Sequence, residues 1–88
     1  METPIEPLYE YYKKATAITT DTRQIKPGSL FVALKGEKFD GNEFAAEALE
    51  KGAAFAIVDR PELAISPQDL LVEDSLLTLQ ALARHHPR

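Results

Sequence analysis

The chain is organised around residues 19–42, T-T-D-T-R-Q-I-K-P-G-S-L-F-V-A-L-K-G-E-K-F-D-G-N. Within them a short apolar run, Leu30–Leu34, lies between two polar loops that are rich in hydroxyl, charged and glycine residues. A run that is apolar throughout is typical of a central strand covered on both faces. The two loops can converge at one end of this strand, and that end is where we expect a binding site.

A turn and another strand are expected just before this run. In Lys26–Ser29, Pro27 presets φ for the first central position of a type II turn, and Gly28 accepts the positive φ of the second. Upstream, Ala17–Thr20 is short and β-branched, which favours a strand. Such a strand would deliver the next three residues, D-T-R, to its end.

A helix and a further buried strand are expected after the run. Asp40 or Asn42 can cap that helix, and Asp40 with Glu43 has the spacing of a capping box. Gly52 is expected to end the helix, and Ala54–Val58, apolar throughout, to be the strand. Strand, helix and strand in this order predict a right-handed parallel crossover. The buried face of the helix is expected to consist of Phe44, Ala45, Ala48 and Leu49.

Helices are also expected at both ends of the chain. Thr3 and Glu6 have capping-box spacing, with Pro4 at the first helical position. At the other end, Leu70–Glu73 is expected to be a short strand and Asp74 the cap of the last helix. The apolar positions are expected to be Ile5, Leu8, Tyr9 and Tyr12 in the first helix, and Leu76, Leu77, Leu79, Leu82 and Ala83 in the last.

These elements predict a single α/β domain over residues 1–88, a small, mostly parallel sheet flanked by helices. The ligand loops are expected at the strand ends, because ligands favour that edge in open sheets. Residues 59–69, with Pro61 and Pro67, are expected to be a surface connection without chemistry.

Composition argues against several classes of protein. The 88 residues carry a net charge of −4, with 44% hydrophobic and 27% charged residues, close to the averages of globular chains. They lack the clustered basic excess that sequence-independent binding of nucleic acid requires. No apolar run approaches the roughly 20 residues that cross a membrane, and the acidic start lacks the pattern of a secretory signal. We therefore expect a cytoplasmic protein whose partners include neither nucleic acid nor membrane.

Familiar catalytic patterns are missing from the sequence. It contains no cysteine, no G-x-x-x-x-G-K-[ST], no G-x-G-x-x-G, and no Ser with an evident base partner. His85 and His86 are adjacent, which suits cations near a helix end better than metal ligands. No catalytic and no metal-binding residue is predicted. Basic residues in the central stretch can bind a small anion or merely solvate the loops: Arg23, Lys26, Lys35 and Lys38.

Four segments together resemble the N-terminal domain of the Mur ligases: D-T-R, K-P-G-S-L-F-V-A-L-K-G, F-D-G-N-E-F and G-A-A-F-A-I-V-D. The resemblance covers roughly Ala17–Leu82. It implies three domains in the full-length ligase: an N-terminal one that holds the UDP part of the substrate, a central ATPase domain and a C-terminal domain. The chain is then expected to be the first of these alone, inactive by itself and without a cofactor, while the full-length ligase uses ATP and Mg²⁺.

The resemblance also implies which residues bind UDP. D-T-R matches the family's D-S-R, whose hydroxyl and neighbours touch the nucleotide, and residues 35–42 match K-G-E-x-F-D-G-H, the loop that faces the uracil and diphosphate. Thr22 keeps the hydroxyl but adds a methyl group, and Asn42 removes the titratable group of the usual His. The implied UDP-binding residues are Asp21, Thr22, Arg23, Lys35, Gly36, Lys38, Phe39, Asp40, Gly41 and Asn42.

Alternatives remain open at this point. The pair Glu37 and Phe39 favours the family member that adds D-alanyl-D-alanine to a UDP-N-acetylmuramoyl peptide over the member that adds the third peptide residue. Judged by the residues alone, D-T-R and F-D-G-N can simply form turns and caps, in which Asp and Asn side chains bind the local backbone. A stand-alone protein-interaction module is the alternative from another class. The expected partners are the UDP-N-acetylmuramoyl peptide and the remaining ligase domains.

Overall fold

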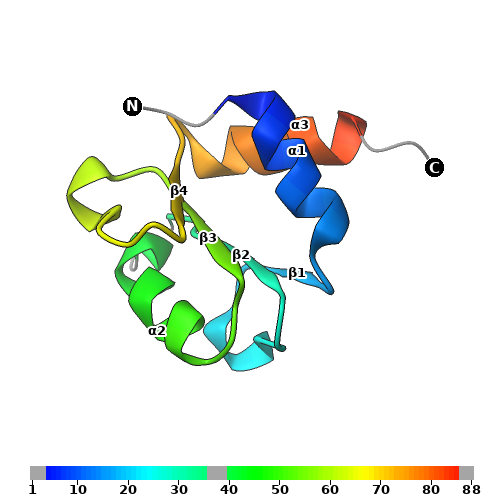
Figure 1. Ribbon diagram of the computed structural model, residues 1–88. Coiled ribbons are helices and arrows are strands. Elements are labelled where there is room, and N and C mark those ends of the chain that lie inside the picture. The colour runs from blue at the N-terminus through cyan, green and yellow to red at the C-terminus, as the bar shows by residue number, and fades with distance from the viewer. Residues whose placement is uncertain (1–3, 36–39, 86–88) are drawn as a thin grey trace.

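The computed structural model describes residues 4–35 and 40–85. Four parallel strands form one sheet in sequence order (Figure 1), which confirms the predicted α/β fold with a small sheet flanked by helices. The strands are β1 (Ile18–Thr19), β2 (Leu30–Val32), β3 (Phe55–Val58) and β4 (Asp69–Leu71). The α-helices are α1 (Ile5–Lys14), α2 (Ala45–Glu50) and α3 (Ser75–His85), and short 3₁₀ helices span Thr22–Gln24, Gly41–Phe44 and Pro61–Leu63.

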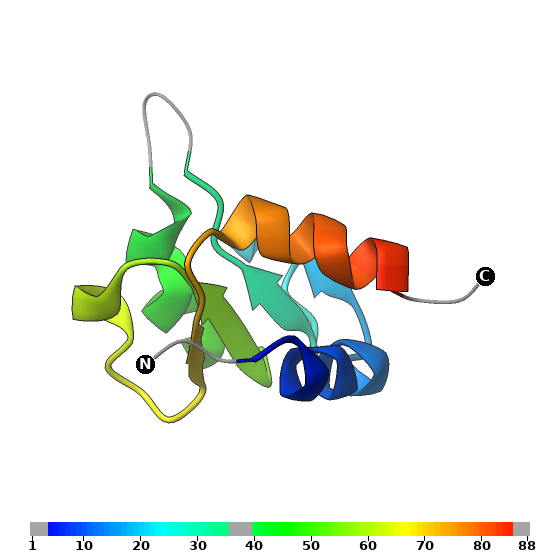
Figure 2. The ribbon, with the colours of Figure 1, turned by 90° about the horizontal axis from the view of Figure 1, so that it is seen from above.

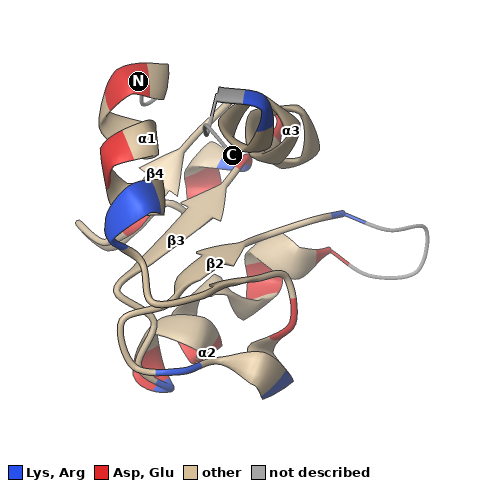
Figure 3. Cartoon of the chain, turned by 90° about the vertical axis from the view of Figure 1, so that its right-hand side faces the viewer, with Lys and Arg blue, Asp and Glu red and all other residues tan. Residues whose placement is uncertain are grey.

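Alternation along β2 divides the core into two layers. Leu30 and Val32 face α1 and α3, whereas Phe31 and Ala33 face α2. Figures 1 and 2 show α1 and α3 together over one face of the sheet and α2 on the other. Because β2 and its neighbour β3 are covered on both faces, they are apolar throughout, and Figure 3 shows the charged residues on the helices and loops around them.

The turn before β2 is formed as predicted. Gly28 has φ +81°, and the Ser29 N–H donates to the Lys26 carbonyl at 3.0 Å. A positive φ at this position is what a type II turn requires, and glycine adopts it without a steric cost. The turn therefore aligns β2 beside β1, where Leu30 pairs with Ile18.

The ends of the chain follow the prediction less closely. α1 begins at Ile5 with an extended Pro4 as its N-cap, one position later than predicted, and Ile5 is 40% exposed. Thr3, His86 and the side chain of His85 lie outside the described residues. Asp74 does cap α3, because its Oδ1 accepts from the Leu77 N–H at 3.0 Å.

The buried stripe of α3 differs from the predicted one. Leu76 and Leu77 are 50% and 63% exposed, whereas Leu82 and the polar Ser75 are fully buried. Ser75, the partly buried Leu79 and Leu82 are spaced four and three residues apart, so they share one helix face. The prediction placed the stripe on the leucines and overlooked that a serine starts it.

Candidate functional site

All four strands point the same way, so the segments that follow them emerge at one edge of the sheet. This carboxyl edge carries residues 20–23 after β1, residues 33–35 and 40–42 after β2, and residues 59–60 after β3. Two of these segments border a cavity of about 470 Å³, which we call the edge cavity. It is lined by Thr20, Asp21, Thr22, Arg23, Phe31, Gly41 and Phe44.

The D-T-R loop is held by its own aspartate. Asp21 caps the 3₁₀ helix Thr22–Gln24, its Oδ1 accepting from the Arg23 N–H at 2.9 Å. The Arg23 guanidinium returns to the same carboxylate, with Nη2 to Oδ2 at 2.9 Å, and these side-chain and backbone hydrogen bonds lower the pKa of Asp21. The Arg23 side chain remains 83% exposed, so its other N–H donors are available to a ligand.

Two charged residues contact this loop, Glu47 from α2 and Lys51 from the C-terminal end of α2. Lys51 Nζ donates to the Thr22 carbonyl at 3.2 Å and lies 3.3 Å from Glu47 Oε2. A hydrogen bond from the Thr22 side chain, followed by the interactions with Lys51, lowers the pKa of Glu47. Lys51 was not among the predicted site residues, and it brings a further positive charge to the D-T-R loop.

Close approach of two backbones fixes the second loop at Gly41. Its N–H donates to the Leu34 carbonyl at 2.8 Å, and a Cβ at this position would lie 2.6 Å from that oxygen. Only glycine fits here, and the reason is space rather than φ. Lys35 and Asp40 form an isolated antiparallel bridge just before it. The predicted site residues Gly36, Lys38 and Phe39 lie outside the described part of the chain, as does Glu37.

Asn42 points into the protein rather than towards the edge cavity. It is 2% exposed, and its Nδ2 donates to Asp40 Oδ1 at 2.6 Å and to Asp59 Oδ1 at 2.7 Å. Its Oδ1 accepts from the Asp59 N–H at 2.7 Å. Both amide hydrogens and the carbonyl oxygen are thus engaged by neighbouring residues.

Asp40, 9% exposed, is held by Arg60 as well as by Asn42. Arg60 Nη1 lies 2.9 Å from Asp40 Oδ2, and Arg60 Nε donates to Glu62 Oε1 at 2.7 Å. Burial acts to raise the pKa of Asp40, but the hydrogen bonds from Asn42 and Arg60 outweigh it and hold that pKa below its ordinary value. The carboxylate is therefore charged and paired under physiological conditions.

Two features of this edge were not foreseen. Asp59 and Arg60 begin the connection that was expected to be without chemistry, yet they bond to Asn42 and Asp40. The signal for them was the one that identified D-T-R, namely polar residues directly after a predicted strand. Phe44, expected in the buried stripe of α2, is 40% exposed beside the edge cavity. It belongs to a 3₁₀ helix, whose tighter turn takes it off the stripe of Ala45 and Ala48.

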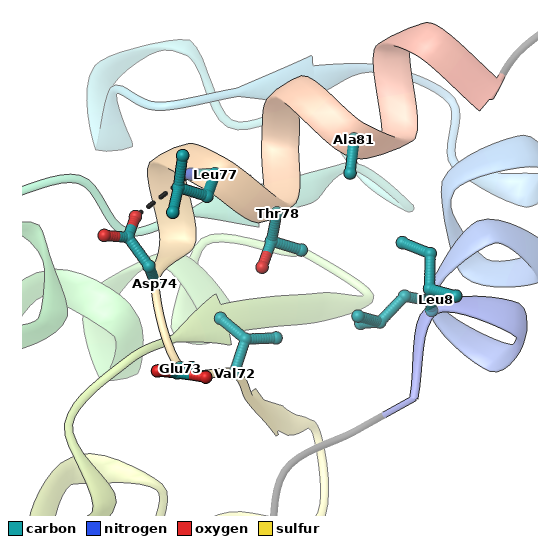
Figure 4. Close-up of a pocket in the computed structure, with 8 residues that line it drawn as sticks. Leu8, Val72, Glu73, Asp74, Leu77, Thr78 and Ala81 are labelled. Carbon is teal, nitrogen blue, oxygen red and sulfur yellow. Dashed lines mark hydrogen bonds between the residues drawn. The ribbon is translucent and has the colours of Figure 1, made fainter.

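A second, larger hollow of about 680 Å³ lies between α1 and α3 (Figure 4). It is lined mainly by apolar side chains and by Glu73, Asp74 and Thr78. None of the predicted site residues lines it. Over residues 4–35 and 40–85, no helix is long and apolar enough to cross a membrane, and no three potential metal ligands gather in one place.

Comparisons with known proteins agree with this architecture. The sequence model described as Mur ligase family, catalytic domain, matches residues 14–86. The chain is 51% identical over 67 residues to the UDP-N-acetylmuramoyl-tripeptide--D-alanyl-D-alanine ligase of Escherichia coli (strain K12), and 41% identical over 63 residues to the UDP-N-acetylmuramoyl-L-alanyl-D-glutamate--2,6-diaminopimelate ligase of Aquifex aeolicus (strain VF5). These matches cover 76% and 72% of the chain, but only 15% and 13% of the two relatives.

A solved Mur ligase structure has a similar fold. The MurF ligase from Thermotoga maritima, crystallised in complex with ADP, aligns with a TM-score of 0.72 at 39% identity. The alignment covers 78% of this chain and 16% of that one. The family model, the relatives and the solved structure thus agree over most of the chain. The chain belongs to the Mur ligase family.

Proposed function

We propose that this chain is the substrate-binding domain of a ligase that adds D-alanyl-D-alanine to a UDP-N-acetylmuramoyl peptide, and that the edge cavity receives the UDP part. The observation that carries the proposal is that D-T-R and two residues after β2, Gly41 and Phe44, line one cavity at the carboxyl edge. Open α/β sheets bind ligands at this edge. The name of the E. coli relative supplies the substrate class.

The side chains at the edge cavity suit the two halves of UDP. A uracil ring requires a flat apolar contact, which the exposed ring of Phe44 supplies beside the hydroxyl groups of Thr20 and Thr22. A diphosphate requires cations and N–H donors, and an arginine fork matches its oxygens. Arg23 is that arginine, while Lys51 adds positive charge beside Thr22.

Asp40 and Asn42 have a different role in this proposal. Their side chains are almost fully buried, and their hydrogen bonds go to Arg60 and Asp59. A direct contact with UDP would require some of these bonds to break. We therefore assign Asp40 and Asn42 to holding the second loop in place, and Gly41 to forming the wall of the cavity.

The rest of the ligase reaction is assigned to other parts of a longer protein. In the described residues neither a phosphate loop nor a group of metal ligands is found, so we assign no ATP or Mg²⁺ contact to this chain. The residues here would bind and orient the substrate while a central ATP-binding domain activates its carboxylate. A cytoplasmic location follows from this role and stays a prediction.

Titration with UDP tests the proposal directly. In ¹⁵N-labelled protein, UDP should shift the amide signals of residues 20–23 and 41–44 and leave α1 largely unaffected. We expect a Kd on the order of millimolar, because contacts from the other domains are missing. Uridine should bind more weakly than UDP, since it lacks the diphosphate that Arg23 is proposed to contact.

Two matched variants sharpen the titration. Arg23→Ala should weaken UDP binding about threefold or more and make the remaining binding less sensitive to salt. Lys13→Ala is the control, since Lys13 is also an exposed cation paired with a nearby carboxylate, Glu10 at 3.0 Å, but it lies on α1. Equal effects of the two variants, or no shift at saturating UDP, would contradict the proposal and favour a protein-interaction module.

A second candidate is the family member that adds the third peptide residue. The relative from Aquifex aeolicus, a 2,6-diaminopimelate ligase at 41% identity, is the observation that favours it. The two candidates bind the same UDP moiety, so the titration does not separate them. An assay of the longer protein would, because only one of D-alanyl-D-alanine and a diaminopimelate-like amino acid should be consumed with ATP. The 88-residue chain alone should consume neither and should not hydrolyse ATP.

A further inference from the structure

We propose that Asp59 is a positioning residue that couples the second ligand loop to α3, so that the placement of α3 sets the geometry of residues 40–42 at the edge cavity. The part of this inference that concerns affinity rests on the proposed binding of UDP. The coupling itself does not, because it is a property of the protein without ligand. Asp59 belongs to neither element that it would join.

Asp59 directs its two carboxylate oxygens at different elements. Oδ1 accepts from Asn42 Nδ2 at 2.7 Å, whereas Oδ2 accepts from the Ser75 N–H, the first residue of α3, at 3.0 Å. The backbone N–H of Asp59 also donates to Asn42 Oδ1 at 2.7 Å. An ionised carboxylate accepts hydrogen bonds at both oxygens, which an amide side chain of the same length does not.

The contact with α3 is made at the N-terminus of the helix, where Asp59 accepts from the Ser75 N–H. The first N–H groups of a helix have no partner within it, and the positive end of the helix dipole favours a negative charge nearby. Asp59 satisfies the Ser75 N–H, while Asp74 satisfies that of Leu77. Ser75 and Leu82 are fully buried, so α3 is seated firmly on the sheet.

The contact with the loop is equally constrained. Asn42 cannot move independently of Asp59, because the two residues share a pair of hydrogen bonds, and the same Asn42 amide donates to Asp40 at 2.6 Å. Gly41, between Asp40 and Asn42, forms part of the wall of the edge cavity. A displacement of α3 therefore reaches the cavity wall through Ser75, Asp59, Asn42 and Gly41.

Two substitutions at Ser75 test the coupling from the far side. Ser75→Pro removes the N–H that Asp59 accepts, and proline is well tolerated at the first position of a helix. Ser75→Ala is the matched control, because it keeps the N–H and removes only a buried hydroxyl that has no hydrogen-bond partner among the described residues. Without ligand, Ser75→Pro should shift the amide signals of residues 40–42 and 59 and speed hydrogen exchange at Gly41, whereas Ser75→Ala should leave them nearly unchanged.

Asp59→Asn tests the coupling at the residue that makes it, and Asp74→Ala is the control. Asp59→Asn places an NH₂ group against one of its two donors, so signals at residues 40–42 and at Ser75 should move together, and UDP binding should weaken about three- to tenfold. Asp74→Ala removes the other cap of α3 without touching the loop. It should perturb Leu77 but keep the hydrogen bond between the Ser75 N–H and Asp59, so the UDP affinity should stay within about twofold.

The outcomes separate this inference from the proposed function. If UDP fails to bind the unmodified chain, the proposed function is wrong, yet the ligand-free spectra of Ser75→Pro and Ser75→Ala still decide the coupling. If Asp59→Asn does not fold, the two Ser75 variants carry the test alone. Loop signals that ignore Ser75→Pro, or that respond equally to Ser75→Ala, overturn the coupling even where UDP binds.

Discussion

The two loops of the edge cavity begin with the same local motif but use it differently. Asp21 and Asp40 both cap a 3₁₀ helix, with φ, ψ of −125°, 120° and −126°, 111°, and each Oδ1 accepts from the N–H two residues on. Asp21 pairs with Arg23 in the same turn, and its side chain is 35% exposed. Asp40 pairs with Arg60, 20 residues away, and its side chain is 11% exposed.

This difference separates a loop that can meet a ligand from a loop that is part of the scaffold. Local pairing leaves the first loop free to offer Arg23 and Thr22 at the surface without disturbing the core. Long-range pairing commits the polar groups of the second loop to Asp59 and Arg60, which follow β3. We infer that the second loop contributes shape to the edge cavity, while the first contributes charge.

The largest effect is expected from Gly41→Ala. The added Cβ would lie 2.6 Å from a backbone oxygen that is part of the sheet edge, so one of the two backbones must move. We expect a loss of about 3 kcal/mol or more in unfolding free energy, at the upper end of overpacking effects. Urea denaturation measures it. Thr22→Ala is the control, because Thr22 follows the other capping aspartate. If Gly41→Ala unfolded at the same urea concentration as Thr22→Ala, the loop would not be fixed at Gly41.

Asn42→Ala should have the next largest effect. It removes the side-chain amide that bonds to Asp40 Oδ1, to Asp59 Oδ1 and to the Asp59 N–H, which should cost about 1–3 kcal/mol. Thr22→Ala, on the first loop, removes only a half-buried hydroxyl and its hydrogen bond to Glu47, so it should cost about 0.5–1 kcal/mol. Thermal and urea unfolding of both variants would compare the loops directly, and similar losses would remove the distinction between them.

The smallest effect concerns pH. Because the folded pKa of Asp40 lies below its unfolded value near 3.8, its charge stabilises the fold above that value, and the contribution is lost as the pH falls through the folded pKa. The unfolding free energy should therefore decrease below about pH 4, and Asp40→Asn should flatten that decrease. The pKa of Asp21 is lowered too, but its pair is exposed and should be screened by roughly 1 M salt. A decrease that salt abolishes entirely would assign the effect to the exposed pairs of Asp21, Glu10 and Glu47, whose carboxyl pKa values are also lowered.

Local signals accounted for much of the fold. The two strands β2 and β3, the type II turn and the cap of α3 by Asp74 each depend on residues that are adjacent or nearly adjacent in sequence. Parallel order then follows from strand, helix and strand, so the shared edge of the loops was predictable. The aspartates at positions 21 and 40 were predictable as caps for the same reason.

Contacts across long separations were not predictable in this way. Asn42 and Asp59 are 17 residues apart, and nothing in either segment indicates which polar group faces the other. The prediction that Leu76 and Leu77 are buried was wrong for a related reason. The sheet beneath α3 decides which face of the helix is buried, and the number of leucines on a face does not. The contacts of UDP with Thr22, Arg23 and Lys38 stay predictions from the resemblance.

The sheet described above has another consequence at its two sides. β1 consists of two residues and β4 of three, one of which is the charged Asp69. Long, flat and apolar edge strands pair with other chains and aggregate, whereas short or charged edges oppose this. The domain thus presents little template for edge-to-edge association. Short and charged edges should therefore limit aggregation at the high protein concentrations that the NMR titration with UDP requires.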